Sequence, residues 1–146
     1  MRWCIVAVGK PRLAYARAGV AEYLARLRCF STVDTSHVRP SDPVREGGQL
    51  LSRSEGCFRL VLDERGKKLT SRAFAEEVKR IEANPRKKCA LLVGGADGLS
   101  ERVREAADLL WSLSSLTLQH EMALVIALEQ IYRAHTIVSG IPYHRD

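Results

Sequence analysis

Residues 89–98 read CALLVGGADG. The first five of these residues are all apolar, which is typical of a strand buried on both faces in the centre of a parallel sheet. Glycines follow directly, and a glycine-rich loop at the carboxyl end of a parallel strand is where open α/β sheets bind their ligands. This stretch therefore predicts an α/β domain with a ligand site at one edge of its sheet.

Strands and helices are expected to alternate on both sides of this stretch. Apolar and β-branched runs predict four further strands, at residues 3–8, 31–38, 58–63 and 109–113. Apolar residues at spacings of three and four predict helices at residues 13–27, 71–83 and 101–107, and a last helix beginning near residue 122. The alternation predicts a mostly parallel α/β sheet flanked by helices, and 146 residues suit a single domain, 1–146.

Local signals predict how these elements begin and end. Pro11 can open the first helix, and Ser71 and Ser100 are candidate N-caps of later ones. Two prolines and two glycines predict a loop at 39–48, with only a short helix at 49–54. Residues 65–68, Arg-Gly-Lys-Lys, are expected to form a basic turn.

Charge and composition narrow the classes of partner. Twenty-three Lys and Arg against 17 Asp and Glu give a net charge of +6, which favours a polyanion such as RNA. No apolar run approaches the roughly 20 residues that span a bilayer, and the amino-terminal apolar stretch is too short for a secretion signal. We therefore expect a cytoplasmic protein that does not enter membranes.

The four cysteines do not form a metal-binding pattern. They lack a CxxC pair and have no histidine at ligand spacing, so no metal is expected and reduced core thiols are the simplest interpretation. The cysteines are Cys4, Cys29, Cys57 and Cys89.

The last helix carries a separate signal. Every residue from Met122 to Leu128 is apolar, and a helix that is apolar on all sides must be covered on all sides. Burial in a homodimer interface is the simplest explanation.

Three segments carry chemistry. The loop Gly94–Gly98 can approach a nucleotide-like ligand, although it matches neither the GxGxxG nor the Walker pattern and could be a plain turn. Residues 112–120, SLSSLTLQH, can hold a flat ring between leucines, or else form only a strand end and a helix start capped by Thr117. The tail Tyr143–Arg145 offers an aromatic ring, an imidazole and a guanidinium suited to an unstacked base, unless it is a frayed terminus.

Together these segments resemble one family. GGADGLS, WSLSSLTLQH, EQIYRA and PYHR occur in the order and spacing of the ribosomal RNA large-subunit methyltransferase H family, a minimal member of the SPOUT class. IVAVGK and AEYLARL are similar to its first strand and first helix. The resemblance covers essentially the whole chain.

The resemblance implies a fold and a reaction. The fold is a SPOUT sheet with a carboxyl-terminal trefoil knot, and the enzyme is a homodimer whose site is completed by the partner. The reaction transfers a methyl group from S-adenosylmethionine to N3 of a pseudouridine in large-subunit (23S) ribosomal RNA. The implied cofactor-binding residues are Leu62, Gly94, Leu113, Ser114, Ser115, Leu116, Thr117 and Leu118.

The tail would hold the target base. Our hypothesis gives Tyr143 the stacking contact, His144 the role of proton acceptor or orienter, and Arg145 the contact with an anion or phosphate. His120 and Arg133 are second choices. Six basic residues are candidates for RNA phosphates: Arg65, Lys67, Lys68, Arg86, Lys87 and Lys88.

Two positions depart from the family pattern. Gln119 stands where the family usually has proline, which would loosen the cofactor loop, and Leu124 stands where it usually has an arginine that could face RNA or the partner. The competing hypothesis is therefore a non-catalytic RNA-binding or ribosome-assembly protein that keeps the fold.

Overall fold

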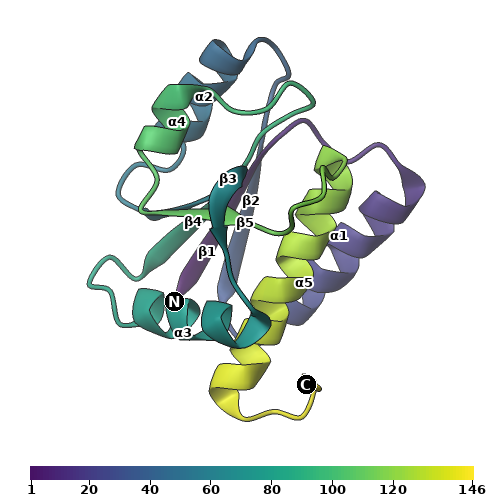
Figure 1. Ribbon diagram of the computed structural model, residues 1–146, viewed down its shortest axis with the longest axis vertical. Helices are drawn as coiled ribbons and strands as arrows, with labels where there is room; N and C mark the ends of the chain where they lie inside the picture. Colours follow the sequence, from purple (N-terminus) through teal and green to yellow (C-terminus); the bar gives the residue numbers. More distant parts are fainter.

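The computed structural model describes residues 1–146 and is built on one five-stranded parallel sheet (Figure 1). The strand order is β2-β1-β4-β3-β5, and every neighbouring pair is parallel, which confirms the predicted fold class. The elements, in chain order, are β1 (Arg2–Val8), α1 (Ala14–Leu27), β2 (Thr32–Val38), α2 (Pro43–Ser52), β3 (Phe58–Lys68), α3 (Ser71–Glu82), β4 (Lys88–Val93), α4 (Glu101–Glu105), β5 (Leu109–Ser112) and α5 (His120–Ser139).

Helices cover both faces of the sheet. Helices α1, α3 and α5 lie on one face, and α2 and α4 lie together on the other (Figure 1). Successive residues of a strand point to opposite faces, so Trp3 and Ile5 of β1 join the larger core while Val6 and Val8 join the smaller one. In the central strand β4, Leu91 likewise joins the larger core and Leu92 the smaller one.

The predicted loop at 39–48 is wrong from residue 43 onward, where α2 begins. Asp42 accepts a hydrogen bond from Arg45 N at 2.9 Å, and Pro43 occupies the first helical turn, where its missing N–H costs nothing. Gly47 then serves packing: a Cβ there would lie 2.6 Å from Ser100 Oγ. A glycine that signals a loop in sequence here allows α2 to approach α4.

The predicted basic turn at 65–68 is also wrong, because these residues continue β3. Strand β3 pairs with β5 twice, and the register shifts between Leu62 and Lys67. Gly66 lies next to the second of these paired stretches, where a Cβ would sit 2.4 Å from the carbonyl carbon and oxygen of Leu110. Only glycine lets the two backbones approach this closely. The trefoil knot implied by the resemblance stays a prediction.

Two helix starts differ from expectation. Thr70, and not Ser71, caps α3, accepting a hydrogen bond from Ala73 N at 3.1 Å. Helix α1 begins at Ala14, three residues after Pro11, and the exposed Arg12 and Leu13 N–H groups donate to Glu121 Oε1 of α5 at 2.6 and 3.1 Å. Ser100 occupies the N-cap position of α4 but makes no capping hydrogen bond.

Helix α5 is covered mainly by its own chain. It packs against α1, α3 and the sheet, and Leu124, Ala127 and Leu128 are buried. This packing accounts for most of the apolar surface that suggested a dimer, whereas Met122 remains 39% exposed. None of the helices combines the length and apolar composition needed to cross a bilayer.

The cysteines are all free thiols, as expected, but they do not all lie in the core. Cys57 and Cys89 are buried, Cys4 is half-buried and Cys29 is exposed. Burial raises the pKa of the Cys89 thiol well above its usual value, so this cysteine stays protonated.

Candidate active site

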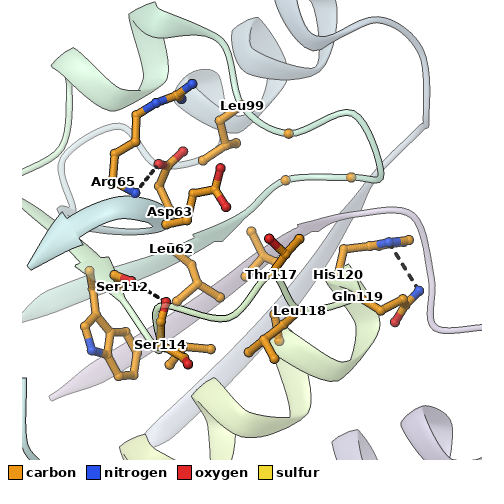
Figure 2. A pocket seen from close by; sticks show the side chains of 18 of the residues that line it. Leu62, Asp63, Arg65, Leu99, Ser112, Ser114, Thr117, Leu118, Gln119 and His120 are labelled. Carbon is orange, nitrogen blue, oxygen red and sulfur yellow. Dashed lines mark hydrogen bonds between the residues drawn. The ribbon is translucent and has the colours of Figure 1, made fainter. Parts of the chain in front are cut away.

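One open pocket of about 660 Å³ lies at the carboxyl ends of β3, β4 and β5 (Figure 2). This is the edge of the sheet at which residues 89–98 predicted a ligand site. The predicted cofactor-binding residues that line it are Leu62, Gly94, Leu113, Ser114, Leu116, Thr117 and Leu118. Ser115 does not line it. Segments that are far apart in the sequence therefore share one cavity.

The glycine loop folds tightly against the mouth of the pocket. Gly98 has a φ of +79°, and its N–H donates to Gly95 O at 3.1 Å. A Cβ on Gly94 would lie 2.9 Å from Leu99 Cδ2. The two interpretations of this loop are thus compatible, because it makes a tight turn and also lines the cavity.

The serine and leucine segment after β5 forms the opposite wall. Its hydroxyls bind the segment itself: Ser112 Oγ donates to Ser114 O at 3.1 Å, and Ser114 Oγ accepts from Leu116 N at 3.0 Å. These bonds leave the leucines to line the pocket, and Leu116 is 72% exposed. The wall therefore offers apolar side chains and backbone groups, which suits a flat heterocycle.

A charged wall was missed by the sequence analysis. Asp63 Oδ1 accepts from Arg65 N at 2.8 Å (Figure 2). Asp63 Oδ2 lies 3.6 Å from Arg104 Nη1. Arg104 also donates to Leu99 O at 2.6 Å, which ties α4 to the glycine loop. Asp63 could have been predicted as a site residue, because it is a carboxylate at the end of a predicted buried strand. Nothing in the sequence around Arg104 indicated a role in the site.

Glu46 lies behind the glycine loop and was missed because its segment was predicted to be a loop. It is 5% exposed, and its Oε2 accepts from Ser41 N at 2.9 Å and lies 3.7 Å from where a Gly95 Cβ would be. Its Oε1 has no hydrogen-bond partner. This carboxylate supports the pocket from outside and does not line it.

The two departures from the family pattern have structural roles. Gln119 caps α5, with its Oε1 accepting from Glu121 N and Met122 N at 2.9 and 3.1 Å, and its φ of −62° is one that proline also adopts. Gln119 therefore fixes the start of α5 by hydrogen bonds, where a proline would fix it by its ring. Thr117 is not the cap. Leu124 is 4% exposed and lies in the core, so position 124 does not face RNA within this chain. His120 lines the pocket next to Gln119.

The tail Tyr143–Arg145 follows the carboxyl end of α5, which is opposite its pocket end, and folds back on the second half of the helix (Figure 1). Helix α5 has 20 residues and is therefore about 30 Å long. The chain thus does not bring its tail residues to its own pocket. His120 lies at the pocket end of α5, whereas Arg133 lies toward the tail, with its Nη1 3.0 Å from His144 Nδ1.

The tail is ordered, not frayed. Tyr143 donates to Glu129 Oε1 at 3.0 Å, lies edge-on to Tyr132 and carries the Arg133 guanidinium 4.7 Å above its ring. Burial, together with hydrogen bonds to Tyr23 and Glu129, raises the pKa of the Tyr143 phenol well above its usual range. Tyr143 therefore stays neutral and offers a ring and a hydroxyl.

The six basic candidates separate into two groups. Arg65 lines the pocket, and Lys67 and Lys68 follow it on the same strand. Arg86 and Lys87 precede β4 and Lys88 is its first residue, so all three lie at the opposite end of the strands, where Arg86 pairs with Asp108 at 3.0 Å. Only the first group adjoins the pocket. No cluster of His, Cys, Asp or Glu side chains suits a metal ion.

Solved structures share this fold. A probable methylase family protein from Haemophilus influenzae is similar with a TM-score of 0.61 at 12% identity, covering 99% of this chain and 70% of that chain. The tRNA (m1G37) methyltransferase from Aquifex aeolicus is similar with a TM-score of 0.55 at 14% identity, covering 91% and 69%.

Sequence relatives are much closer. A ribosomal RNA large subunit methyltransferase H from Thermus thermophilus is 51% identical over 145 residues, which is 99% of each chain. The protein of the same name from Deinococcus radiodurans is 39% identical over the same lengths. The family model described as "Predicted SPOUT methyltransferase" matches residues 1–144, so this chain belongs to the SPOUT methyltransferase family.

Proposed function

We propose that this protein methylates N3 of a pseudouridine in large-subunit ribosomal RNA, with S-adenosylmethionine as methyl donor. The observation that carries the proposal is that one pocket at the carboxyl ends of the strands is lined by Leu62, Gly94, Leu113, Ser114 and residues 116–118. The names of the full-length relatives, at 39–51% identity, support the substrate class. Residues 1–146 would act as one domain in the cytoplasm.

The pocket fits the proposed cofactor. Its volume of about 660 Å³ lies within the usual range for small-molecule sites. Leu62, Leu116 and Leu118 can hold the adenine, and Asp63 and Arg104 place both signs of charge where an amino acid moiety needs them. A structurally similar methyltransferase from Legionella pneumophila, at a TM-score of 0.51, was solved with the bound cofactor SAM. The sulfonium of this cofactor supplies an activated methyl group.

The active site would be shared between two copies of the chain. The tail packs on the second half of α5 and does not line its own pocket, so it can serve the pocket of a partner in a homodimer. Exposed apolar side chains beside the pocket, Leu13, Tyr15, Leu116 and Met122, offer a surface for that partner. Tyr15 and Leu13 adjoin the start of α5 through Gln119 and Glu121.

The proposed chemistry needs positioning and charge stabilisation. The N3–H of the base must lose its proton before the nitrogen attacks the methyl group, so a partner tail should orient the ring and stabilise its anion. Tyr143 would stack on the base, His144 would orient it or accept the proton, and Arg145 would contact the anion or a phosphate. Arg145 is exposed and makes no hydrogen bond or ion pair within the chain, so it is available for RNA.

RNA would approach along the basic side of the pocket. Arg65, Lys67 and Lys68 can hold phosphates near it, and the net charge of +6 favours association in general. The target base must lie in a loop or leave its stack.

Mass spectrometry of ribosomal RNA tests the proposal. Cells that lack the gene should lose one methyl-pseudouridine, and the purified protein should restore it in a single-turnover assay with large-subunit RNA or ribosomes. His144→Ala and Arg145→Ala should each slow this step with the cofactor saturating. Unchanged rates would remove the roles given to the tail, and unchanged RNA in the deletion strain would refute the function.

A further inference from the structure

The tail is joined to α3 by a chain of polar contacts. Arg72 Nε donates to both carboxylate oxygens of Asp146, at 2.9 and 3.0 Å, and its Nη2 forms a third contact. The same carboxylate lies 2.8 Å from His144 Nε2. Hydrogen bonds from Arg72, and then from His144, lower the pKa of Asp146 to about 2, so the carboxylate is charged at neutral pH. An arginine 74 residues away in sequence thus reaches the imidazole through one carboxylate.

These contacts define the tautomer of His144. A guanidinium only donates, so Nδ1, 3.0 Å from Arg133 Nη1, must accept. A carboxylate only accepts, so Nε2 must carry the proton that it donates to Asp146. The His144 side chain is 14% exposed, and both of its nitrogens are engaged. In this arrangement the ring orients the tail.

Arg133 is itself held in place from the other side. It donates to Glu129 Oε1 at 2.6 and 3.1 Å, and the same oxygen accepts from the Tyr143 hydroxyl at 3.0 Å. The side chains of Glu129 and Arg133 are only 18% and 23% exposed, whereas those of Arg72 and Asp146 are 61% and 65% exposed. The His144 ring is therefore bound between a rigid pair on α5 and an exposed pair that water or RNA can reach.

We propose that Arg72 and Asp146 are positioning residues that hold His144 as the Nε2–H tautomer and keep the tail in the geometry needed for methyl transfer. The inference rests on the proposed function, because it assigns the tail to the target base. Neither residue need touch the base, since both act through the imidazole.

The test is NMR of the intact, ¹⁵N-labelled protein, with the two His144 nitrogens assigned. The wild type should show the Nε2–H tautomer. Arg72→Ala and Asp146→Ala should each convert His144 to a mixture of tautomers, the double variant should add nothing to the single ones, and Arg72→Lys should restore part of the wild-type signal. Arg80→Ala is the matched control: Arg80 is also on α3 and paired, with Glu77, but is remote from the tail, and the spectrum of His144 should not change.

Kinetics provide the second readout. Single-turnover methylation by Arg72→Ala, with RNA and cofactor saturating, should slow about tenfold, because a misplaced group loses the benefit of orientation. Its affinity for S-adenosylmethionine should equal that of the wild type. An Nδ1–H tautomer in the wild type, or identical His144 signals in the wild type and Arg72→Ala, would overturn the inference. A wild type that transfers no methyl group would refute the proposed function instead, since the spectrum needs neither RNA nor cofactor.

Discussion

The two halves of α5 carry different kinds of groups. At the amino end, backbone loops and leucines surround an open cavity, with Gly94 and Leu116 among the residues that line it. On the second half of the helix, charged and aromatic side chains bind one another, and Glu129, Arg133 and His144 form a connected set of hydrogen bonds with no cavity between them. The pocket end can bind a small molecule, and the tail presents polar and aromatic groups held in place by hydrogen bonds.

Under the proposed function, this difference leads us to expect that one subunit alone is insufficient for the reaction. A pocket formed by backbone atoms holds a cofactor through shape but offers few groups for handling a proton. The tail has those groups but no cavity, and its packing against Glu129 and Arg133 of α5 holds it away from the pocket. Two copies related by a twofold axis, each tail facing the other copy's pocket, would supply both.

Mixed dimers give the largest expected effect. Gly94→Val should disrupt the glycine loop, because a Cβ there would lie 2.9 Å from Leu99 Cδ2, and Tyr143→Ala with Arg145→Ala should remove the tail contacts. Each homodimer should then lose at least about 100-fold in methylation rate. A mixed dimer, co-expressed with two tags, keeps one intact pocket facing one intact tail and should recover about half the wild-type activity. Thermal melting of each variant checks its folding. An inactive mixed dimer would place pocket and tail in the same subunit.

Gly66 tests whether the pocket end depends on backbone contact. A methyl group there would meet the Leu110 backbone at 2.4 Å with no side chain able to move aside, so Gly66→Ala should cost at least about 3 kcal/mol in free energy of unfolding. Urea denaturation measures the loss. Gly48→Ala is the control: a Cβ there has nothing within 4 Å, and alanine in helix α2 should add about 0.5–1 kcal/mol. Equal stability of the two variants would contradict the close contact between Gly66 and the Leu110 backbone.

His135 lies in the second half of α5, is buried, and is uncharged at neutral pH. Its Nε2 accepts from Trp3 Nε1 at 2.9 Å, Phe30 stacks on its ring, and its Nδ1 lies 3.3 Å from Glu82 Oε1. Burial, and then the positive amino terminus, lower the pKa of His135 to about 4. At neutral pH the imidazole is therefore neutral and its contact with Glu82 is not an ion pair.

This low pKa predicts acid sensitivity. Above about pH 6.5 both folded and unfolded chains carry a neutral His135, whereas between pH 6.5 and 4 only the unfolded chain gains the proton. The free energy of unfolding should thus fall by roughly 2–3 kcal/mol from pH 7 to pH 4 on account of this residue. His135→Gln, which can still accept from Trp3, should lose less stability over that range in urea denaturation. A variant as acid-sensitive as the wild type would assign the effect to other groups.

Gln119 gives the smallest expected effect. Gln119→Ala removes the side chain that caps α5 and should cost about 1 kcal/mol in stability, measured by thermal melting. Gln119→Pro fits the φ of −62° and should recover part of the loss by stiffening the loop. Cofactor affinity measured by calorimetry should change with stability in the same order, because the residue lines the pocket. Weaker binding by the proline variant than by the alanine variant would contradict this role.

The sequence predicted those parts of the molecule that depend on local pattern. The apolar run at 89–93 placed β4 and the glycine loop after it. Of residues 113–118, which the resemblance assigned to the cofactor, all but Ser115 line the same pocket. Close approaches between distant segments were not visible: Gly47 and Gly66 read as loop and turn because their role depends on Ser100 and Leu110. The charged wall was missed for the same reason, since Asp63 and Arg104 meet only after folding.

The contact between Trp3 and His135 has a consequence for synthesis. It joins the first strand to the last helix, which also supplies Leu124, Leu128 and Ile131 to the larger core. One face of the sheet therefore stays uncovered until nearly the whole chain has been translated. A ribosome stalled late on this message would display an apolar surface, and such nascent chains should be the species most dependent on chaperones.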